Sequence, residues 1–300
     1  MHQGAAGLDD ADLPGFWLDA DRSSLRGQRL FIKLSRLRLV AAVVAAIGGA
    51  LTWSAGWFNI WAAVALLGFV VALTVEIVLI VVQPERDWYA GRALAESAKT
   101  LAWRYAVAAD PFLPSLTKVQ ARELMRARLS EVAKAQGQHR VAIHPADSDI
   151  TPAMDRLREA PFRERKEAYV KNRTETQLQW YATRAEWNQA RAMRWRVALV
   201  LLEVLAIVLA AGRAFGRWEV DWSGVLAAGV GAGAAWMGLK QYSPLVSAYA
   251  TASNELAVQA GRLRDTEEAD WPMAVASAEE AISREHTMWV ASRTGQPTAP

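Results

Sequence analysis

The feature that most constrains this chain is a run of 37 residues, 39–75, without a single charged side chain. As α-helix such a run would be ~55 Å long, because each residue adds about 1.5 Å. The hydrocarbon core of a bilayer is ~30 Å thick, so the run is nearly long enough to cross it twice. A soluble domain rarely carries such a stretch. We therefore predict a helical hairpin that enters a membrane and returns to the same side.

A second pair of apolar stretches lies near the middle of the second half of the chain, and a charged turn, 213–221, joins them. The same argument from length predicts a second hairpin there. The predicted fold class is therefore an all-α membrane protein with two transmembrane hairpins and long cytoplasmic helical extensions. The four predicted spans are about 39–56, 60–82, 197–212 and 222–239.

Composition narrows the possible chemistry. The chain has no cysteine, which excludes disulfides and thiolate chemistry. The segment 83–196 holds 21 Lys and Arg against 14 Asp and Glu, whereas 240–300 holds 5 against 8. The basic side chains of the middle segment alternate with acidic ones instead of clustering. This pattern favours contact with anionic lipid headgroups over nucleic acid, so we expect no nucleic-acid partner.

The distribution of Lys and Arg predicts the orientation of both hairpins, because cytoplasmic flanks are enriched in these residues. The first turn, 54–59, holds neither, whereas both outer flanks do. In the second turn Arg213 and Arg217 are balanced by Glu219 and Asp221. We therefore expect a multi-pass plasma-membrane protein with both termini in the cytoplasm. The flanking residues are Arg22, Arg26, Arg29, Lys33, Arg36 and Arg38, then Arg86 and Arg92, then Arg191, Arg194 and Arg196, and finally Lys240.

Tryptophans gather at both predicted turns, where an indole could occupy the membrane–water interface or simply pack in a core. The N-terminal residues 1–21 are acidic, and the first apolar run begins only at Leu39, so we do not expect a secretory signal. The tryptophans are Trp53, Trp57 and Trp61 at the first turn and Trp218 and Trp222 at the second.

The polar parts of the chain also read as helices. We predict helices over 85–109 and 116–136, one very long helix over 152–195 that continues into the third span, and helices after Lys240 and around 274–292. The predicted divisions are an acidic segment 1–21, a first two-span module 22–136, a linker 137–152, a second two-span module 153–293 and a tail 294–300. One face of the long helix carries a stripe of residues, most of them spaced three or four apart, which predicts a coiled coil or packing on neighbouring helices. The residues of this stripe are Val170, Gln177, Tyr181, Ala185, Asn188, Ala192 and Trp195.

Two carboxylates, Glu76 and Glu203, lie inside predicted spans. Each is seven residues, or ~10 Å of helix, from the cytoplasmic end of its span. An ionised carboxylate at the bilayer centre costs ~2.5 kcal/mol or more, so each should face protein or water. One interpretation is a carboxylate ring that lines a cation path in an oligomer. The other is a protonated or paired glutamate that reaches Arg196, Arg38 or Lys240.

Gly229 and Gly233 form a Gly-x-x-x-Gly pair in the fourth predicted span, which is rich in small residues. Small residues allow the backbones of two helices to approach closely in lipid. The pair therefore predicts either tight packing on the third span within one chain or a seam between copies of the chain.

No motif of an enzyme is present. The sequence has no Gly-x-Ser-x-Gly and no phosphate-binding Gly-rich loop. Its four histidines, His2, His139, His144 and His286, do not pair at the spacing of metal ligands on one helix. We therefore expect no catalytic activity, no metal and no cofactor.

Two segments of the first half, LPGFWLDADRSSLRGQRLFIKLSRLRL and WYAGRALAESAKTLAWRYAVAADPF, flank its apolar run. Through these segments the first half resembles one subgroup of the SLATT domains, and the second half resembles another. SLATT domains are two-transmembrane effector modules found with nucleotide-signalling bacterial conflict systems. The matching positions in the first half are Ala20, Asp21, Ser24, Gln28, Trp88, Arg92, Ala95, Glu96, Lys99, Trp103, Arg104, Tyr105, Pro111 and Phe112. In the second half they are Tyr169, Arg173, Gln177, Trp180, Tyr181, Tyr242, Ser243, Tyr249, Glu280, Glu285 and Trp289.

The resemblance implies an oligomeric effector of a bacterial antiphage system that forms a pore in, or disrupts, the inner membrane. It also implies a signal-sensing partner that acts in trans, because the two modules account for nearly all of the 300 residues. The alternative function is a non-conducting membrane scaffold whose cytoplasmic helices recruit partners.

Overall fold

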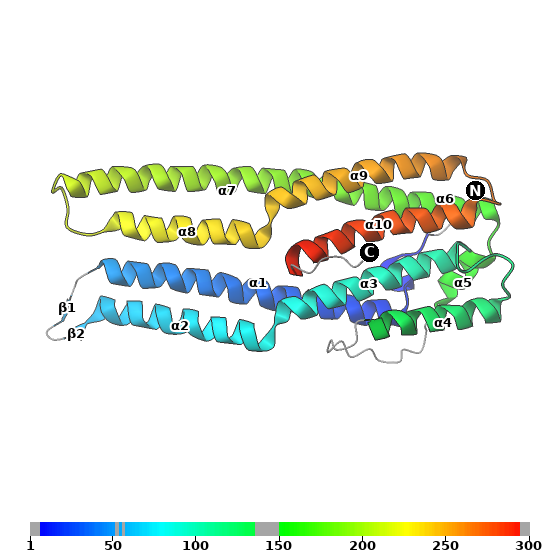
Figure 1. The fold of residues 1–300 in the computed structure, drawn as a ribbon, viewed down its shortest axis with the longest axis horizontal. Helices are drawn as coiled ribbons and strands as arrows, with labels where there is room; N and C mark the ends of the chain where they lie inside the picture. Colours follow the sequence, from blue (N-terminus) through cyan, green and yellow to red (C-terminus); the bar gives the residue numbers. More distant parts are fainter. Residues whose placement is uncertain (1–6, 52–53, 56–57, 136–149, 295–300) are drawn as a thin grey trace. The chain divides into compact units, whose positions relative to one another are not determined.

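A computed structural model describes residues 7–51, 54–55, 58–135 and 150–294, and it describes side chains of the last helix as far as Ser283. The described residues are almost entirely helical, which confirms the predicted all-α class (Figure 1). The elements are η1 (Asp10–Asp12), α1 (Gly15–Ala50), β1 (Ser54–Ala55), β2 (Phe58–Asn59), α2 (Ile60–Val82), α3 (Pro84–Ala106), α4 (Lys118–Ala135), α5 (Pro152–Glu159), α6 (Phe162–Ala168), the π-helix η2 (Tyr169–Glu175), α7 (Thr176–Ala214), α8 (Trp222–Lys240), α9 (Tyr242–Asp265) and α10 (Trp271–Thr294).

These elements form two compact units that do not follow the order of the sequence. The hairpin unit consists of residues 29–84 and 185–247, and the bundle unit consists of 1–28, 85–184 and 248–300. Helices α1 and α7 each run unbroken from one unit into the other. Each unit is therefore built from both halves of the chain.

Within the described residues, three helical stretches are long and apolar enough to cross a membrane, and each contains one element of the hairpin unit: α2, α7 or α8. In their most apolar windows only 11%, 0% and 6% of the residues are buried. An exposed apolar surface of this extent marks contact with a membrane or with protein, and the length of the three stretches matches a bilayer. The stretches are Ile60–Ala106, Phe162–Ala214 and Trp222–Asp265.

The first predicted span, 39–56, differs from the structure. Helix α1 ends at Ala50, and its last eighteen residues include three cations, Lys33, Arg36 and Arg38, so it does not qualify as a span by itself. The chain then reverses through an antiparallel pair, Ser54–Ala55 with Phe58–Asn59, which satisfies backbone groups that a helix would otherwise pair. Trp53 and Trp57 lie outside the described residues.

The predicted single helix over 152–195 is wrong, because the chain breaks after α5. Pro161 has no amide proton and its ring would clash with the preceding turn, so the helix ends at Glu159 and a new one starts at Phe162. The Tyr169–Glu175 segment is then π-helical. Helix breaks also follow α2 and α8, where Gln83 and Gln241 adopt the left-handed conformation, with φ of 51° and 52°.

The core of the bundle unit is one continuous cluster of buried apolar side chains from both halves of the chain. Trp103 of α3, Tyr169 of η2 and Trp271 of α10 stack edge to face, with ring centroids 5.9 Å and 5.7 Å apart. The Trp271 indole also donates a hydrogen bond of 3.1 Å to the carbonyl of Val107. The two modules seen in the sequence therefore share the larger of the two core clusters in the described residues.

Candidate functional site

Glu76 lies on α2 in the hairpin unit, where its carboxylate accepts a hydrogen bond from the guanidinium of Arg38 on α1. The positive charge of Arg38 compensates the negative charge of Glu76, which follows 37 uncharged residues. Of the arrangements that the sequence allows for Glu76, the structure therefore has the paired one. Both side chains remain partly exposed, at 37% and 43%.

Glu203 lies in a different environment on α7. Its side chain is exposed, and among the described residues it forms no ion pair and no hydrogen bond. Val200 and Ile207, about one turn away on either side, are 56% and 68% exposed. Glu203 is thus a carboxylate within an apolar exposed surface, and nothing in the described part of the chain covers it.

The two glycines of the Gly-x-x-x-Gly pair also differ. A Cβ atom on Gly233 would lie 2.7 Å from Cδ2 of Leu199 and 3.6 Å from the ring of Trp195, so this position packs on α7 within the chain. A Cβ atom on Gly229 would meet nothing within 4 Å. Gly233 therefore permits the close approach of α7 and α8, whereas Gly229 lies beside open space.

Most residues that carry the family resemblance lie in the bundle unit, and many of them are core residues there. Tyr105 donates a hydrogen bond of 2.7 Å to Asp155, and burial raises its pKa to about 12. Tyr181 and Tyr249 pack at 5.6 Å within a small second cluster. Trp88, Trp103, Tyr169 and Arg173 are buried as well. Arg92 and Glu96 form an ion pair of 3.9 Å on α3, and Arg104 reaches Asp110 at 4.0 Å.

Arg173 finds its partner in a residue that sequence reasoning did not select, Glu279 on α10. The guanidinium donates two hydrogen bonds to this carboxylate, Nε to Oε1 at 2.9 Å and Nη2 to Oε2 at 2.8 Å. Tyr169 and Thr100 donate to the same carboxylate at 3.0 Å and 2.8 Å. The sequence analysis selected Glu280 and Glu285 instead, and only the fold shows which face of α10 is buried.

Asp155 was missed too. This carboxylate of α5 accepts hydrogen bonds from Tyr105 and Arg122, and Lys118 lies at 3.3 Å. Burial by itself would raise its pKa, but the hydrogen bonds from Arg122, Tyr105 and Lys118 outweigh burial and hold the pKa below 3.8. A single Asp in a short segment carries no sequence signal for this role.

Two guanidinium groups donate hydrogen bonds to backbone carbonyls at the end of α3 and just beyond it. Arg158 donates to the carbonyls of Tyr105 at 3.0 Å, Phe112 at 2.8 Å and Leu113 at 2.9 Å. Arg165 donates to the carbonyl of Val107 at 3.2 Å. Tyr105 lies in the last turn of α3, and Val107, Phe112 and Leu113 lie in the segment that follows, so the two arginines hold this segment by satisfying its backbone carbonyls.

Several predicted residues lie beyond the part of the chain that the structure describes in full. The side chains of Glu285, His286 and Trp289 in α10 are not described, and His2, His139 and His144 lie outside the described ranges. Most of the linker predicted over 137–152 is also outside them. Thr151, at its end, caps α5 by accepting a hydrogen bond from the amide of Met154.

The resemblance seen in the sequence is confirmed by comparison with family models. Residues 14–166 match SLATT_3, described as SMODS and SLOG-associating 2TM effector domain 3. Residues 169–289 match SLATT_1, described as SMODS and SLOG-associating 2TM effector domain 1. The chain belongs to the SLATT family. It joins two SLATT domains of different subgroups in one polypeptide. Neither the curated proteins nor the solved structures compared with this chain give a match.

The two SLATT matches meet between Lys166 and Tyr169, at the end of α6. Both compact units therefore contain parts of both SLATT domains. Both families are described as two-transmembrane effector domains, which links the chain to SMODS and SLOG signalling partners.

Proposed function

We propose that this tandem SLATT protein is a non-enzymatic effector that assembles into an oligomer and permeabilises the bacterial inner membrane when a signalling partner triggers it. The observation that carries the proposal is the exposed carboxylate of Glu203 within the apolar surface of α7. An ionised group facing lipid at this depth costs at least ~2.5 kcal/mol, so it needs water or a protein partner. A second copy of the chain can supply either.

The contrast with Glu76 supports this assignment. Glu76 is paired with Arg38 inside one chain, so its charge is already compensated. Glu203 has no such partner among the described residues. In a ring of subunits, repeated Glu203 carboxylates would form a cation-attracting constriction, the arrangement that cation channels use.

The proposal includes four spans. Residues 39–50 of α1 carry no charge, and we assign them to the remaining span, as the second transmembrane segment of the first SLATT domain. Cationic residues at the outer ends of both hairpins favour cytoplasmic termini. The trigger acts in trans, through a partner that senses a nucleotide or a related signal.

The test is ion flux in liposomes and membrane potential in cells. We expect the wild-type protein to conduct cations in preference to anions. We expect Glu203→Gln to weaken this preference, measured as a shift of the reversal potential toward zero under a salt gradient. Glu123→Gln, which removes an equally exposed carboxylate from α4, serves as the matched control and should leave selectivity unchanged.

Two results would contradict the proposal. Unchanged conductance and selectivity in Glu203→Gln would remove this residue from the ion path. A membrane potential that stays intact in cells that express the protein together with its trigger would favour the non-conducting scaffold.

A further inference from the structure

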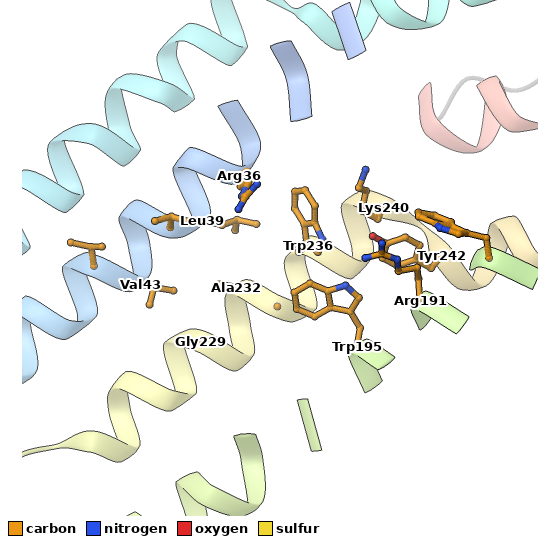
Figure 2. Close-up of a pocket in the computed structure, with 14 residues that line it drawn as sticks. Arg36, Leu39, Val43, Arg191, Trp195, Gly229, Ala232, Trp236, Lys240 and Tyr242 are labelled. Atoms are coloured by element: carbon orange, nitrogen blue, oxygen red, sulfur yellow. The ribbon is translucent and has the colours of Figure 1, made fainter. Parts of the chain in front are cut away.

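A cavity in the hairpin unit lies between helices of the two hairpins, where α1, α7 and α8 converge (Figure 2). Its volume is about 680 Å³, in the range of sites that hold a small molecule. Its walls are divided by chemistry: apolar side chains line one part, and aromatic and cationic side chains line the other.

The apolar part comes from α1 and α8. Figure 2 shows Leu39 and Val43 on α1 and Gly229 and Ala232 on the neighbouring stretch of α8. Gly229 contributes no side chain, and the space that a Cβ atom would enter there is open. The glycine therefore widens this part of the cavity.

Three cations and several aromatic rings also line the cavity, with Arg36 beside Leu39 on α1 and with Lys240 and Arg191 near Trp236 and Tyr242 (Figure 2). Arg36, Arg191 and Lys240 line the cavity, and of its fourteen described lining residues none is acidic. The guanidinium of Arg191 lies 5.0 Å from the ring of Trp187, and the ammonium of Lys240 lies 5.3 Å from that of Trp236. Trp and cationic side chains together are typical of the level of lipid headgroups.

The dimensions match one leaflet of a bilayer. From Arg36 to Val44 the cavity follows eight residues of helix, or ~12 Å, and from Lys240 to Gly229 it follows eleven, or ~16 Å. Half of the hydrocarbon core is ~15 Å thick. Val40 and Val44 in the wall are 51% and 37% exposed, so this apolar wall is accessible, as entry of an acyl chain requires.

We propose that this cavity binds an anionic phospholipid. The phosphate lies among Arg36, Arg191 and Lys240, and one acyl chain runs along α1 and over Gly229. Basic pockets between transmembrane helices on the cytoplasmic side bind anionic headgroups in this way. The bound lipid would join the hairpin of the first SLATT domain to that of the second, whether or not the assembly conducts ions.

The test uses native mass spectrometry of the full-length protein in detergent, titrated with phosphatidylglycerol or phosphatidylcholine of equal chain length. We expect phosphatidylglycerol to bind at least tenfold more tightly. Neutralising all three cations, Arg36→Gln with Arg191→Gln and Lys240→Gln, should weaken its binding by roughly 100-fold, at about fivefold for each cation. Arg194→Gln, three residues from Arg191 and outside the cavity, should change binding less than twofold.

A second variant tests the acyl-chain part. At Gly229 a Cβ atom would meet nothing within 4 Å, so Gly229→Phe introduces a ring into this part of the cavity, and it should weaken phosphatidylglycerol binding while all three cations remain. Equal affinity for the two lipids, or equal losses in the triple variant and in Arg194→Gln, would overturn the proposal. Displacement of the lipid by inorganic phosphate alone, with Gly229→Phe unaffected, would also overturn it.

Discussion

Arg38 and Glu76, the charged residues immediately before and after the 37-residue uncharged run, form an ion pair. The pair therefore joins the two ends of the run and closes the base of the first hairpin. The backbones of α1 and α2 also approach each other closely within the uncharged run. A Cβ atom on Gly68 of α2 would lie 2.8 Å from the carbonyl oxygen of Ala41 on α1. The α1–α2 hairpin is thus held by a charge pair at its base and by backbone proximity along its length.

Reversing one member of this pair should impair the hairpin. Arg38→Glu or Glu76→Arg places two like charges together at the membrane boundary, at a cost of at least ~2.5 kcal/mol for an uncompensated ion within the bilayer. We expect each single variant to reduce the fraction of protein that elutes as a monodisperse species in detergent. The double variant restores the pair with its sense reversed and should recover that fraction. Failure of the exchange to recover it would show that the pair does not stabilise the hairpin.

The pair formed by Arg173 and Glu279 should dominate the stability of the bundle unit. The exposed fractions of their side chains are 1% and 0%, so removing one partner leaves a buried charge without compensation. We expect Glu279→Ala to destabilise the protein by about 3–5 kcal/mol, visible as a large fall in Tm by calorimetry. Glu131→Gln breaks the exposed pair with Arg128 on α4 and should cost less than about 1 kcal/mol. Similar falls in both variants would contradict this ranking.

Asp155 predicts a specific sensitivity to acid. Its pKa in the folded protein lies below 3.8, chiefly because the hydrogen bonds from Arg122, Tyr105 and Lys118 outweigh burial. Its stabilising contribution is therefore complete above the unfolded value of 3.8 and disappears as the pH falls through the lower folded value. We expect Asp155→Asn to lower Tm at pH 7 and to reduce the fall in Tm between pH 4 and more acidic conditions. Parallel Tm curves for variant and wild type below pH 4 would be inconsistent with this linkage.

Gly91 and Gly261 should respond in opposite directions to the same substitution. A Cβ atom on Gly91 of α3 would lie 2.7 Å from the amide nitrogen of Ser24 and 2.9 Å from the carbonyl oxygen of Ala20, both on the backbone of α1. Gly91→Ala should therefore destabilise the bundle unit by about 1–3 kcal/mol. On α9 a Cβ atom at Gly261 would meet nothing within 4 Å, so Gly261→Ala should stabilise the helix by about 0.5–1 kcal/mol. Urea or thermal unfolding of the two variants checks the difference in sign.

The comparison of sequence with structure is instructive at particular residues. The uncharged run and the two later apolar stretches predicted the all-α class, because only helices satisfy every backbone group in lipid over that length. The helix break at Pro161 was visible in the sequence and was overlooked. The residues that resemble SLATT domains correctly marked Tyr105 and Tyr169 as special, although their structural role is to pack the bundle core.

The sequence by itself determined two properties of this protein: the family to which it belongs and its suitability for a lipid environment. Both depend on motif spacing and hydrophobic length, which are properties of a local stretch of chain. The tertiary structure decided which charges have partners. Glu76 and Glu203 look alike in the sequence, but among the residues that the structure describes only Glu76 pairs with an arginine, and Arg173 pairs with Glu279, 106 residues away. Such pairings depend on which faces of distant helices come together. Helical periodicity places a side chain on a face but carries no information about the face that it will meet.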